Sequence, residues 1–326
     1  MTAKFILQYL SRSVKEIGKL SDSKLSNLYM IYDFLKCSIA HGCILNQYTR
    51  GEFYKLKGCE RRKSMTYRRI CRLYRQLNDP LSIHLLENKV DFNRHFHEFI
   101  SRKWLSAKEM TFSQFDDLCS SCESLIIKPL ASCEGEGIHR VTVPLSHAPR
   151  LALFNKYGEG DFIIEECLKQ HPGMVFGNTS VNTIRAHSLI DGHGNVHILK
   201  SLLRAGVGEC VVDNYCAGGC VYEVDNSTGR VISTSLTKDH SILYIHPKTD
   251  ICMLGYKIPN WDKVIASIKK AHLLIPGCRF IGWDIAITPD GVEYIEGNHN
   301  PDYELLEFVG TIGWHDKIKH ILENSD

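Results

Sequence analysis

Two carboxylates and one amide, Asp284, Glu296 and Asn298, lie in the segment RFIGWDIAITPDGVEYIEGNHNP, residues 279–301. If this segment is a β-hairpin with Asp284 opposite Glu296, their Cβ atoms lie about 5 Å apart. Two carboxylates at that distance repel by about 3 kcal/mol at an effective dielectric constant of 20. A hard cation with oxygen ligands relieves this repulsion. The sequence therefore predicts a Mg²⁺ site at these three residues, with a solvent-exposed hairpin face as the alternative.

The hairpin itself is predicted from the turn Thr288–Gly291, which has proline in its second position and glycine in its last. This composition favours a type I turn followed by a one-residue bulge at Gly291. The expected register pairs Thr288 with Val292, Asp284 with Glu296 and Gly282 with Asn298. Alternation along the strands then gives a polar face with the three candidate ligands. The opposite, core-facing side is expected to hold Ile281, Trp283, Ile285, Ile287 and Ile295.

A second group of residues suits a nucleotide. The apolar strand SLIIKP, residues 124–129, ends in Lys128 and is followed by the loop ASCEGEGI with Gly135 and Gly137. Glycines let backbone N–H groups turn toward an anion, and a lysine adds a point charge, although a glycine-containing hairpin turn looks similar. The segment DFIIEECL, residues 161–168, is an apolar strand that reaches two glutamates, followed by Cys167 and Leu168. Its backbone edge can bind a purine while a carboxylate accepts from the amino group.

Two arginines, Arg185 in TIRAHSLI and Arg204 in LKSLLRAG, lie inside otherwise apolar strands. An arginine in such a place needs an anionic partner or a route to solvent. Either a bound phosphate or a buried arginine–carboxylate pair satisfies this requirement.

The order of these segments resembles the ATP-grasp superfamily, and within it the sugar-transfer-associated group found with bacterial polysaccharide genes. The resemblance covers residues from about 88 to 314 and is carried by NKVDF, IIKP, EGEG, FIIEECL, SVNTIR, LLRAG, VDNYCAGG, GWDIAI and EGNHNP. It implies an α+β fold, in which two subdomains with antiparallel sheets clasp ATP. It also implies a two-step reaction, in which a substrate carboxylate becomes an acyl phosphate and an amine then displaces phosphate.

The resemblance assigns roles to individual residues. It implies phosphate contacts from Lys89 and Lys128 and from the loop residues Glu134, Gly135 and Gly137. It implies adenine binding by Glu165 and by the backbone of Cys167 and Leu168, with ribose contacted by Gln170 or His171. It implies that Asp284, Glu296 and Asn298 hold Mg²⁺ and that Arg185 and Arg204 meet the γ-phosphate or the acyl phosphate.

Three regions are expected to position these groups: a basic helical region at 1–85, a subdomain with the phosphate loop at 86–165, and a subdomain with the metal site at 166–326. In the first region a helix over 25–40, capped by Ser21 or Ser23, has apolar residues at helical spacing. These residues are Leu25, Leu28, Ile31, Tyr32, Leu35 and Ile39. Beyond residue 120, short β-rich runs predict antiparallel hairpins. They are SLIIKP, HRVTV, DFIIEE, TIRAHSLI, VHILKSLLR, RVISTSL, RFIGWDIAI and VEYIE. Helices are expected at PNWDKVIASIKKAHLLIP, capped by Asn260, and at WHDKIKHILEN.

Composition places the chain among folded proteins, with 44% hydrophobic and 23% charged residues in 326. No apolar run approaches the ~20 residues of a membrane span, and the N-terminus does not resemble a signal peptide. The 13 cysteines are irregularly spaced, which predicts reduced thiols and a cytoplasmic location.

Charge is unevenly distributed along the chain. Residues 1–110 hold 21 Lys and Arg against 10 Asp and Glu, whereas the remainder holds 18 against 27. The basic run RRKSMTYRRICRLYR, residues 61–75, is expected to be a solvated helix with one apolar stripe. The alternative is a surface for an anionic partner, such as a phosphate-bearing substrate, membrane headgroups or nucleic acid.

The leading hypothesis is therefore a carboxylate–amine ligase that uses ATP and Mg²⁺. Its substrates would be a small-molecule carboxylate donor and an amine acceptor, linked to a sugar or another envelope precursor. A phosphotransferase on the same nucleotide site and a polyanion-binding module with a vestigial ATP site are the alternatives. Many ATP-grasp enzymes begin with an α/β domain that helps to build the acceptor site, and the helical residues 1–85 depart from that pattern.

Overall fold

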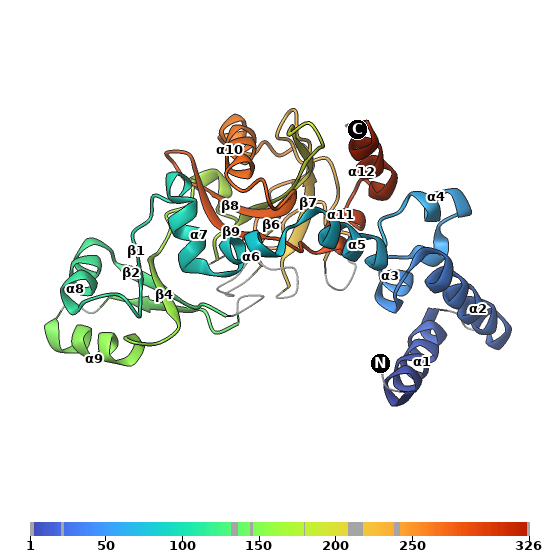
Figure 1. The fold of residues 1–326 in the computed structure, drawn as a ribbon, viewed down its shortest axis with the longest axis horizontal. Coiled ribbons are helices and arrows are strands. Elements are labelled where there is room, and N and C mark those ends of the chain that lie inside the picture. Colours follow the sequence, from blue (N-terminus) through green and yellow to red (C-terminus); the bar gives the residue numbers. More distant parts are fainter. Residues whose placement is uncertain are drawn as a thin grey trace. The chain divides into compact units, whose positions relative to one another are not determined.

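The computed structural model describes residues 3–20, 23–131, 136–143, 146–178, 180–207, 218–237 and 242–324. The chain divides into two compact units, one of residues 1–76 with 302–326 and one of residues 77–301 (Figure 1). The first unit is helical and the second contains two antiparallel sheets. The predicted α+β composition with a helical N-terminal region is confirmed. The C-terminal segment, expected to belong to the metal-site subdomain, groups with the N-terminal helices instead.

The helical unit contains two longer helices and several short ones. They are α1 (Ala3–Ile17), η1 (Gly18–Leu20), α2 (Lys24–His41), α3 (Leu45–Thr49), η2 (Phe53–Lys55), α4 (Gly58–Lys63), α5 (Tyr67–Leu77), α11 (Tyr303–Glu307) and α12 (Trp314–Glu323). Ser23 caps α2, as predicted, by accepting a hydrogen bond from the Ser26 amide at 3.1 Å. Gly42 ends the helix in the left-handed region with φ 71°. The core of this unit includes Phe34, Tyr48 and Phe53.

The first sheet of the second unit has the strand order β1-β4-β2-β3. Its strands are β1 (Trp104–Ser106), β2 (Ser124–Pro129), β3 (His139–Thr142) and β4 (Phe162–Glu166). Helices α8 (Phe112–Ser121) and α9 (His147–Tyr157) pack against it (Figure 1). Phe115 and Leu118 of α8 meet Leu125, Ile127 and Ile164 of the sheet in a shared apolar core.

The second sheet has the order β7-β6-β5-β8-β9, with every neighbouring pair antiparallel. Its strands are β5 (Thr183–Ile190), β6 (Val196–Ala205), β7 (Cys220–Val224), β8 (Phe280–Ile287) and β9 (Val292–Asn298). Helix α10 (Trp261–Leu273) packs on this sheet through Trp261, Val264 and Ile268 (Figure 1). The remaining helices of the unit are α6 (Pro80–Glu87), α7 (Lys89–His95), η3 (His97–Phe99) and η4 (Pro172–Met174).

Most predicted strands form where expected, but three local predictions need correction. The run RVISTSL forms isolated bridges, at Val231 and Leu236 to β7 and at Arg230 to Lys257, instead of a regular strand. Strands β1 and β7 were not predicted. Asn260 precedes α10 as expected, but its side chain donates to the Thr288 carbonyl at 3.1 Å rather than capping the helix. The partner of Asn260 lies 28 residues further along the chain, so the local pattern does not reveal it.

No helix in the described ranges combines the length and the apolar content that crossing a membrane requires.

Candidate functional site

The hairpin β8–β9 places the candidate metal ligands together. Asp284 lies opposite Glu296 and Gly282 opposite Asn298, as predicted from the sequence. The Nδ2 atom of Asn298 donates to Oε1 of Glu296 at 3.3 Å, so the amide and the carboxylate are neighbours on one face. The site end of the hairpin thus has the expected register.

The turn end of the hairpin differs from the prediction. Thr288 pairs with Gly291 through N···O distances of 3.0 and 3.3 Å, and Val292 lies opposite Ile287 instead of Thr288. Gly291 does not have positive φ, so the bulge predicted there is wrong. The register shifts between Asp284 and Ile285, opposite the extra residue Ile295.

This bulge changes which side chain enters the core. Tyr294 lies opposite Ile285 and is fully buried, whereas Ile295, predicted to face the core, is only half-buried. An aromatic ring buries more apolar surface than an isoleucine. The bulge therefore gains the burial of Tyr294 and still returns Glu296 to the face of Asp284.

The counter-charge for Asp284 comes from two arginines. Arg185 lies directly across from Asp284 on β5 and donates from Nε and from Nη2, the latter at 2.8 Å. Arg204 of β6 donates from Nη1 at 2.9 Å. The alternative of a buried arginine–carboxylate pair thus describes both arginines, and the charge expected from a metal ion is partly supplied by guanidinium groups. Burial would raise the pKa of Asp284, but these guanidinium groups outweigh it and hold the pKa below its ordinary value.

Glu296 has the opposite electrostatic environment. Burial, and then the charge of Asp284, raise the pKa of Glu296 above its ordinary value. Within the described residues no group of three or more His, Cys, Asp and Glu side chains is arranged for a metal ion. The donor set consists of two carboxylates and an amide, which fits a hard cation that prefers oxygen.

Glu165, predicted to bind adenine, is buried in a network of charges. Its Oε1 accepts from Asn93 Nδ2 at 3.0 Å and from Arg102 Nη2 at 2.8 Å, and its Oε2 lies 2.5 Å from Lys128 Nζ. Burial opposes ionisation, but Arg102 and Lys128 hold the pKa of Glu165 below its ordinary value. Glu165 therefore orients Lys128, and adenine binding by its carboxylate stays a prediction.

Arg102 connects the two sheets and was not predicted. Its Nη1 donates to Glu293 Oε1 at 2.9 Å and to the Tyr294 carbonyl at 2.7 Å, both on β9, while Nη2 reaches Glu165 on β4. Glu293 also accepts from the backbone N–H groups of Ser101 and Arg102. The sequence around Arg102 has no feature that predicts this role, because the residue lies in an ordinary polar run, Ser101–Lys103.

The two lysines predicted for phosphate lie near the end of β2. Lys89 begins α7, and its Nζ donates to the carbonyl of Leu130 at 3.3 Å, two residues beyond Lys128. Gly137 has φ +73°, and a Cβ there would lie 2.9 Å from Pro129 Cγ. Glycine is therefore required at this point of the loop. The predicted loop residues Glu134 and Gly135 lie outside the described residues.

The segment after β4 uses several of its predicted ligands internally. The backbone N–H of Cys167 donates to the carbonyl of Ser124 at 3.1 Å. An adenine contact from the backbone of Cys167 would therefore use the Cys167 carbonyl. The side-chain amide of Gln170 bonds both backbone groups of Asn182. His171 Nδ1 accepts from the Gly173 amide at 3.0 Å. Roles for Leu168 with adenine and for Gln170 or His171 with ribose stay predictions.

Asn182, in the SVNTIR segment, holds the arginine-bearing strands together. It is fully buried, its Nδ2 donates to the Met174 carbonyl at 2.6 Å, and its Oδ1 accepts from the Gly206 amide at 2.8 Å. The bond to Gly206 ties the start of β5 to the end of β6, and the bond to Met174 ties it to η4. In the sequence, the SVNTIR motif that contains both Asn182 and Arg185 was the feature from which this role could have been predicted.

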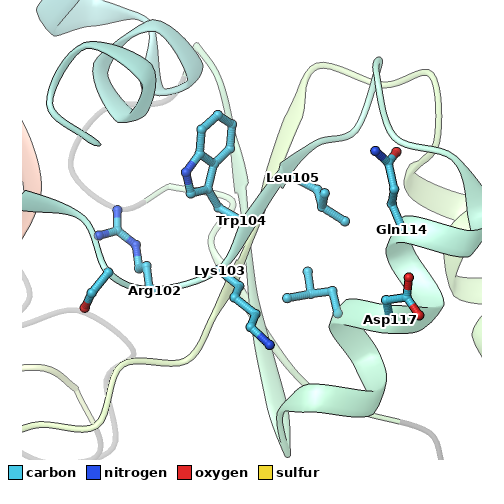
Figure 2. A pocket seen from close by; sticks show the side chains of 8 residues that line it. Arg102, Lys103, Trp104, Leu105, Gln114 and Asp117 are labelled. Carbon is cyan, nitrogen blue, oxygen red and sulfur yellow. The ribbon is translucent and has the colours of Figure 1, made fainter. Parts of the chain in front are cut away.

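A pocket of about 430 Å³ lies elsewhere, between β1 and α8 (Figure 2). Its lining residues are Ser101, Arg102, Lys103, Trp104, Leu105, Gln114, Asp117 and Leu118. It contains none of the predicted site residues. The convergence of charged groups near Asp284 therefore identifies the candidate site better than this pocket does.

Comparisons with known proteins agree with the geometry at the level of family. Residues 151–323 match the sequence profile of the family described as "Sugar-transfer associated ATP-grasp". A comparison with curated protein sequences gives no match.

Solved structures of low sequence identity are also similar. The ATP-grasp ligase PsnB with precursor peptide PsnA2 and AMPPNP is 14% identical, with a TM-score of 0.46 over 79% of this chain and 66% of that chain. PsnB with a phosphomimetic variant of its minimal precursor, Mg and ADP is 13% identical, with a TM-score of 0.43 over 77% of this chain and 61% of that chain. D-Alanine–D-alanine ligase from Bacillus anthracis with ATP is 14% identical, with a TM-score of 0.44 over 76% and 69%. This chain thus spans less than two thirds of the length of some of these proteins.

Proposed function

Because this chain belongs to the sugar-transfer associated ATP-grasp family, we propose that it is an ATP- and Mg²⁺-dependent, ADP-forming ligase that joins a carboxylate to an amine. The observation that carries the proposal is the convergence of Asp284, Glu296 and Asn298 with Arg185 and Arg204 on one sheet. Carboxylates beside paired guanidinium groups suit the handling of phosphoryl groups.

In the proposed first step a carboxylate oxygen of the substrate attacks the γ-phosphorus of ATP. The bond to the bridging oxygen breaks, and ADP leaves with that electron pair. In the second step the amine attacks the acyl carbon, phosphate leaves, and the nitrogen loses a proton. The product is an amide, and the substrates belong to envelope or polysaccharide precursors in a cytoplasmic setting.

The chain's own residues supply charge stabilisation for the first step. Arg185 and Arg204 are fixed by Asp284, so their orientation is set before a substrate arrives. Lys89 and Lys128 would contact the phosphates. Mg²⁺ held by Asp284, Glu296 and Asn298 would neutralise charge on the phosphate oxygens.

The test incubates the protein with ATP, Mg²⁺ and hydroxylamine, together with panels of amino acids and sugar acids. Formation of ADP and a hydroxamate with at least one carboxylate is expected. A stable phosphorylated product would replace the ligase by a phosphotransferase. Absence of ADP formation across the panels would leave a binding module and overturn the proposal.

The informative variant is Glu296→Gln, which removes a candidate ligand without removing the partner of the two arginines. We expect a loss of at least about 100-fold in ADP formation. Asp290→Asn, an exposed change in the turn of the same hairpin, is the matched control and should keep full activity. Equal activity of the two variants would contradict the assignment of Glu296.

A further inference from the structure

Helix α2 carries apolar residues on two opposite faces. Phe34 and Cys37 point inward and are 2% and 1% exposed in the core of the helical unit. Six large side chains point outward, and their exposed fractions run from 41% to 80%. They are Leu25, Leu28, Tyr29, Tyr32, Leu35 and Ile39, and we call them the outer stripe. A large exposed apolar surface of this kind normally marks an interaction site.

The spacing in the outer stripe points to a helical partner. Residues 25, 28, 32, 35 and 39 are separated alternately by three and four positions. This is the a/d pattern of a coiled-coil seam, in which side chains of one helix insert between those of another. Helix α2 has 18 residues and is therefore about 27 Å long, enough for five seam residues.

The size of the outer stripe matches a stable interface. Six side chains of this size at these exposures present on the order of 700 Å², close to the ~800 Å² per partner of a standard interface. The largest apolar patch of a typical monomer is about 300–600 Å². The stripe is thus large for a surface that stays in water.

The charges on α2 permit the helix to pair with itself. Asp33 is turned away from the stripe and is bound by Arg61 at 2.7 and 2.8 Å. Lys36 flanks the stripe, and in an antiparallel pair centred on Tyr32 it lies beside Tyr29 of the second helix. A lysine beside a tyrosine ring is favourable, so self-pairing brings no like charges together along the seam.

A membrane surface fits less well. Helices that lie on membranes have an apolar face opposite a face rich in Lys and Arg. The face of α2 opposite the stripe is packed into the protein core.

We infer that α2 is a dimerisation helix, whose outer stripe packs against the outer stripe of a second copy of this chain. Sedimentation equilibrium of the full chain should give twice the 37.1 kDa mass of one chain at micromolar concentrations. Leu28→Glu should raise the dissociation constant of the dimer at least about 100-fold, because it removes a buried leucine from both copies. Ser26→Glu, an exposed change off the stripe, is the matched control and should leave the dimer intact.

Circular dichroism of the Leu28→Glu variant should show unchanged helix content, because Leu28 contributes little to the core of the single chain. A wild-type protein that stays monomeric at 100 µM would overturn the inference. So would a dimer weakened equally by both variants. Monomers that sediment with vesicles of phosphatidylserine and phosphatidylcholine through the stripe would assign it to a membrane instead.

Discussion

At the scale of single residues, the two carboxylates of the candidate site differ in how their charge is neutralised. Asp284 is held by Arg185 and Arg204, whereas burial, and then the charge of Asp284, raise the pKa of Glu296. The sequence alone predicts that Asp284→Asn and Glu296→Gln both leave the fold intact. With the structure, we expect this only of Glu296→Gln, because Asp284→Asn removes the buried carboxylate to which both Arg185 and Arg204 donate.

Arg102 gives the first prediction. Replacing it by Met leaves Glu165 and Glu293 buried without their shared cation, and this should lower the free energy of unfolding by about 3–5 kcal/mol. Urea denaturation followed by circular dichroism measures the change. Lys103→Met alters the next residue, which is exposed, and should change stability by less than about 0.5 kcal/mol. Indistinguishable midpoints for the two variants would show that the network does not stabilise the fold.

At the scale of elements, the hairpin β8–β9 positions the site through a close approach at Gly282. A Cβ at this position would lie 2.5 Å from Cβ of Pro301, just beyond the hairpin. A proline ring cannot rotate away, so only glycine fits opposite Asn298. The bulge at Ile295 and this close contact together determine where the polar face of the hairpin lies.

Gly282→Ala should therefore destabilise the protein by about 1–3 kcal/mol through overpacking. It should also reduce any Mg²⁺-dependent ADP formation, since Gly282 lies opposite Asn298. Gly291→Ala, in the turn of the same hairpin, is the control because the nearest atom to its Cβ would be Lys263 Cδ at 3.8 Å. Thermal unfolding compares the melting temperatures of the two variants, and equal values would exclude the steric explanation.

At the scale of the whole molecule, the N-terminal and C-terminal segments of the chain belong to the same compact unit. The C-terminal helices α11 and α12 belong to the helical unit formed by residues 1–76. Asn46 of α3 donates to Glu304 of α11, joining segments 258 residues apart. Burial, and then the charge of Asp302, raise the pKa of Glu304 to about 7. We therefore expect the stability of this unit to depend on pH.

This dependence gives a pH prediction. Between its ordinary pKa of 4.5 and about 7, Glu304 keeps a proton in the folded state that the unfolded state has lost. Stability should therefore fall as pH rises through this window. Glu304→Gln should remove that loss, making the variant more stable than wild type by about 2 kcal/mol at pH 8 and equal to it at pH 4. Urea midpoints at both pH values test this.

Glu323→Gln, an exposed change in α12, is the control for Glu304→Gln and should follow the wild type at both pH values. A Glu304→Gln variant with the same pH dependence as wild type would show that the side chain ionises normally in the folded protein.

Alternation along a strand allowed the sequence to predict that Glu296 and Asn298 share one face of the hairpin. Alternation of side chains along a strand is a local property, so Glu296 and Asn298 had to share a face once the segment became β-structure. The boundaries of β2 and β5 and the cap at Ser23 are local in the same way. The motif order also predicted the family, because each motif is a short run that can be read without its neighbours.

The partners of the buried charges could not be predicted from the sequence. Arg102 finds Glu165 at a separation of 63 residues and Glu293 at 191, and no periodicity links such positions. The bulge at Ile295 depends on the burial of Tyr294 in a core built from several elements. The exposure of Leu25 and Ile39 likewise depends on which face of α2 meets its neighbours, because the pattern of a helix shows two apolar faces but not which of them the fold will cover.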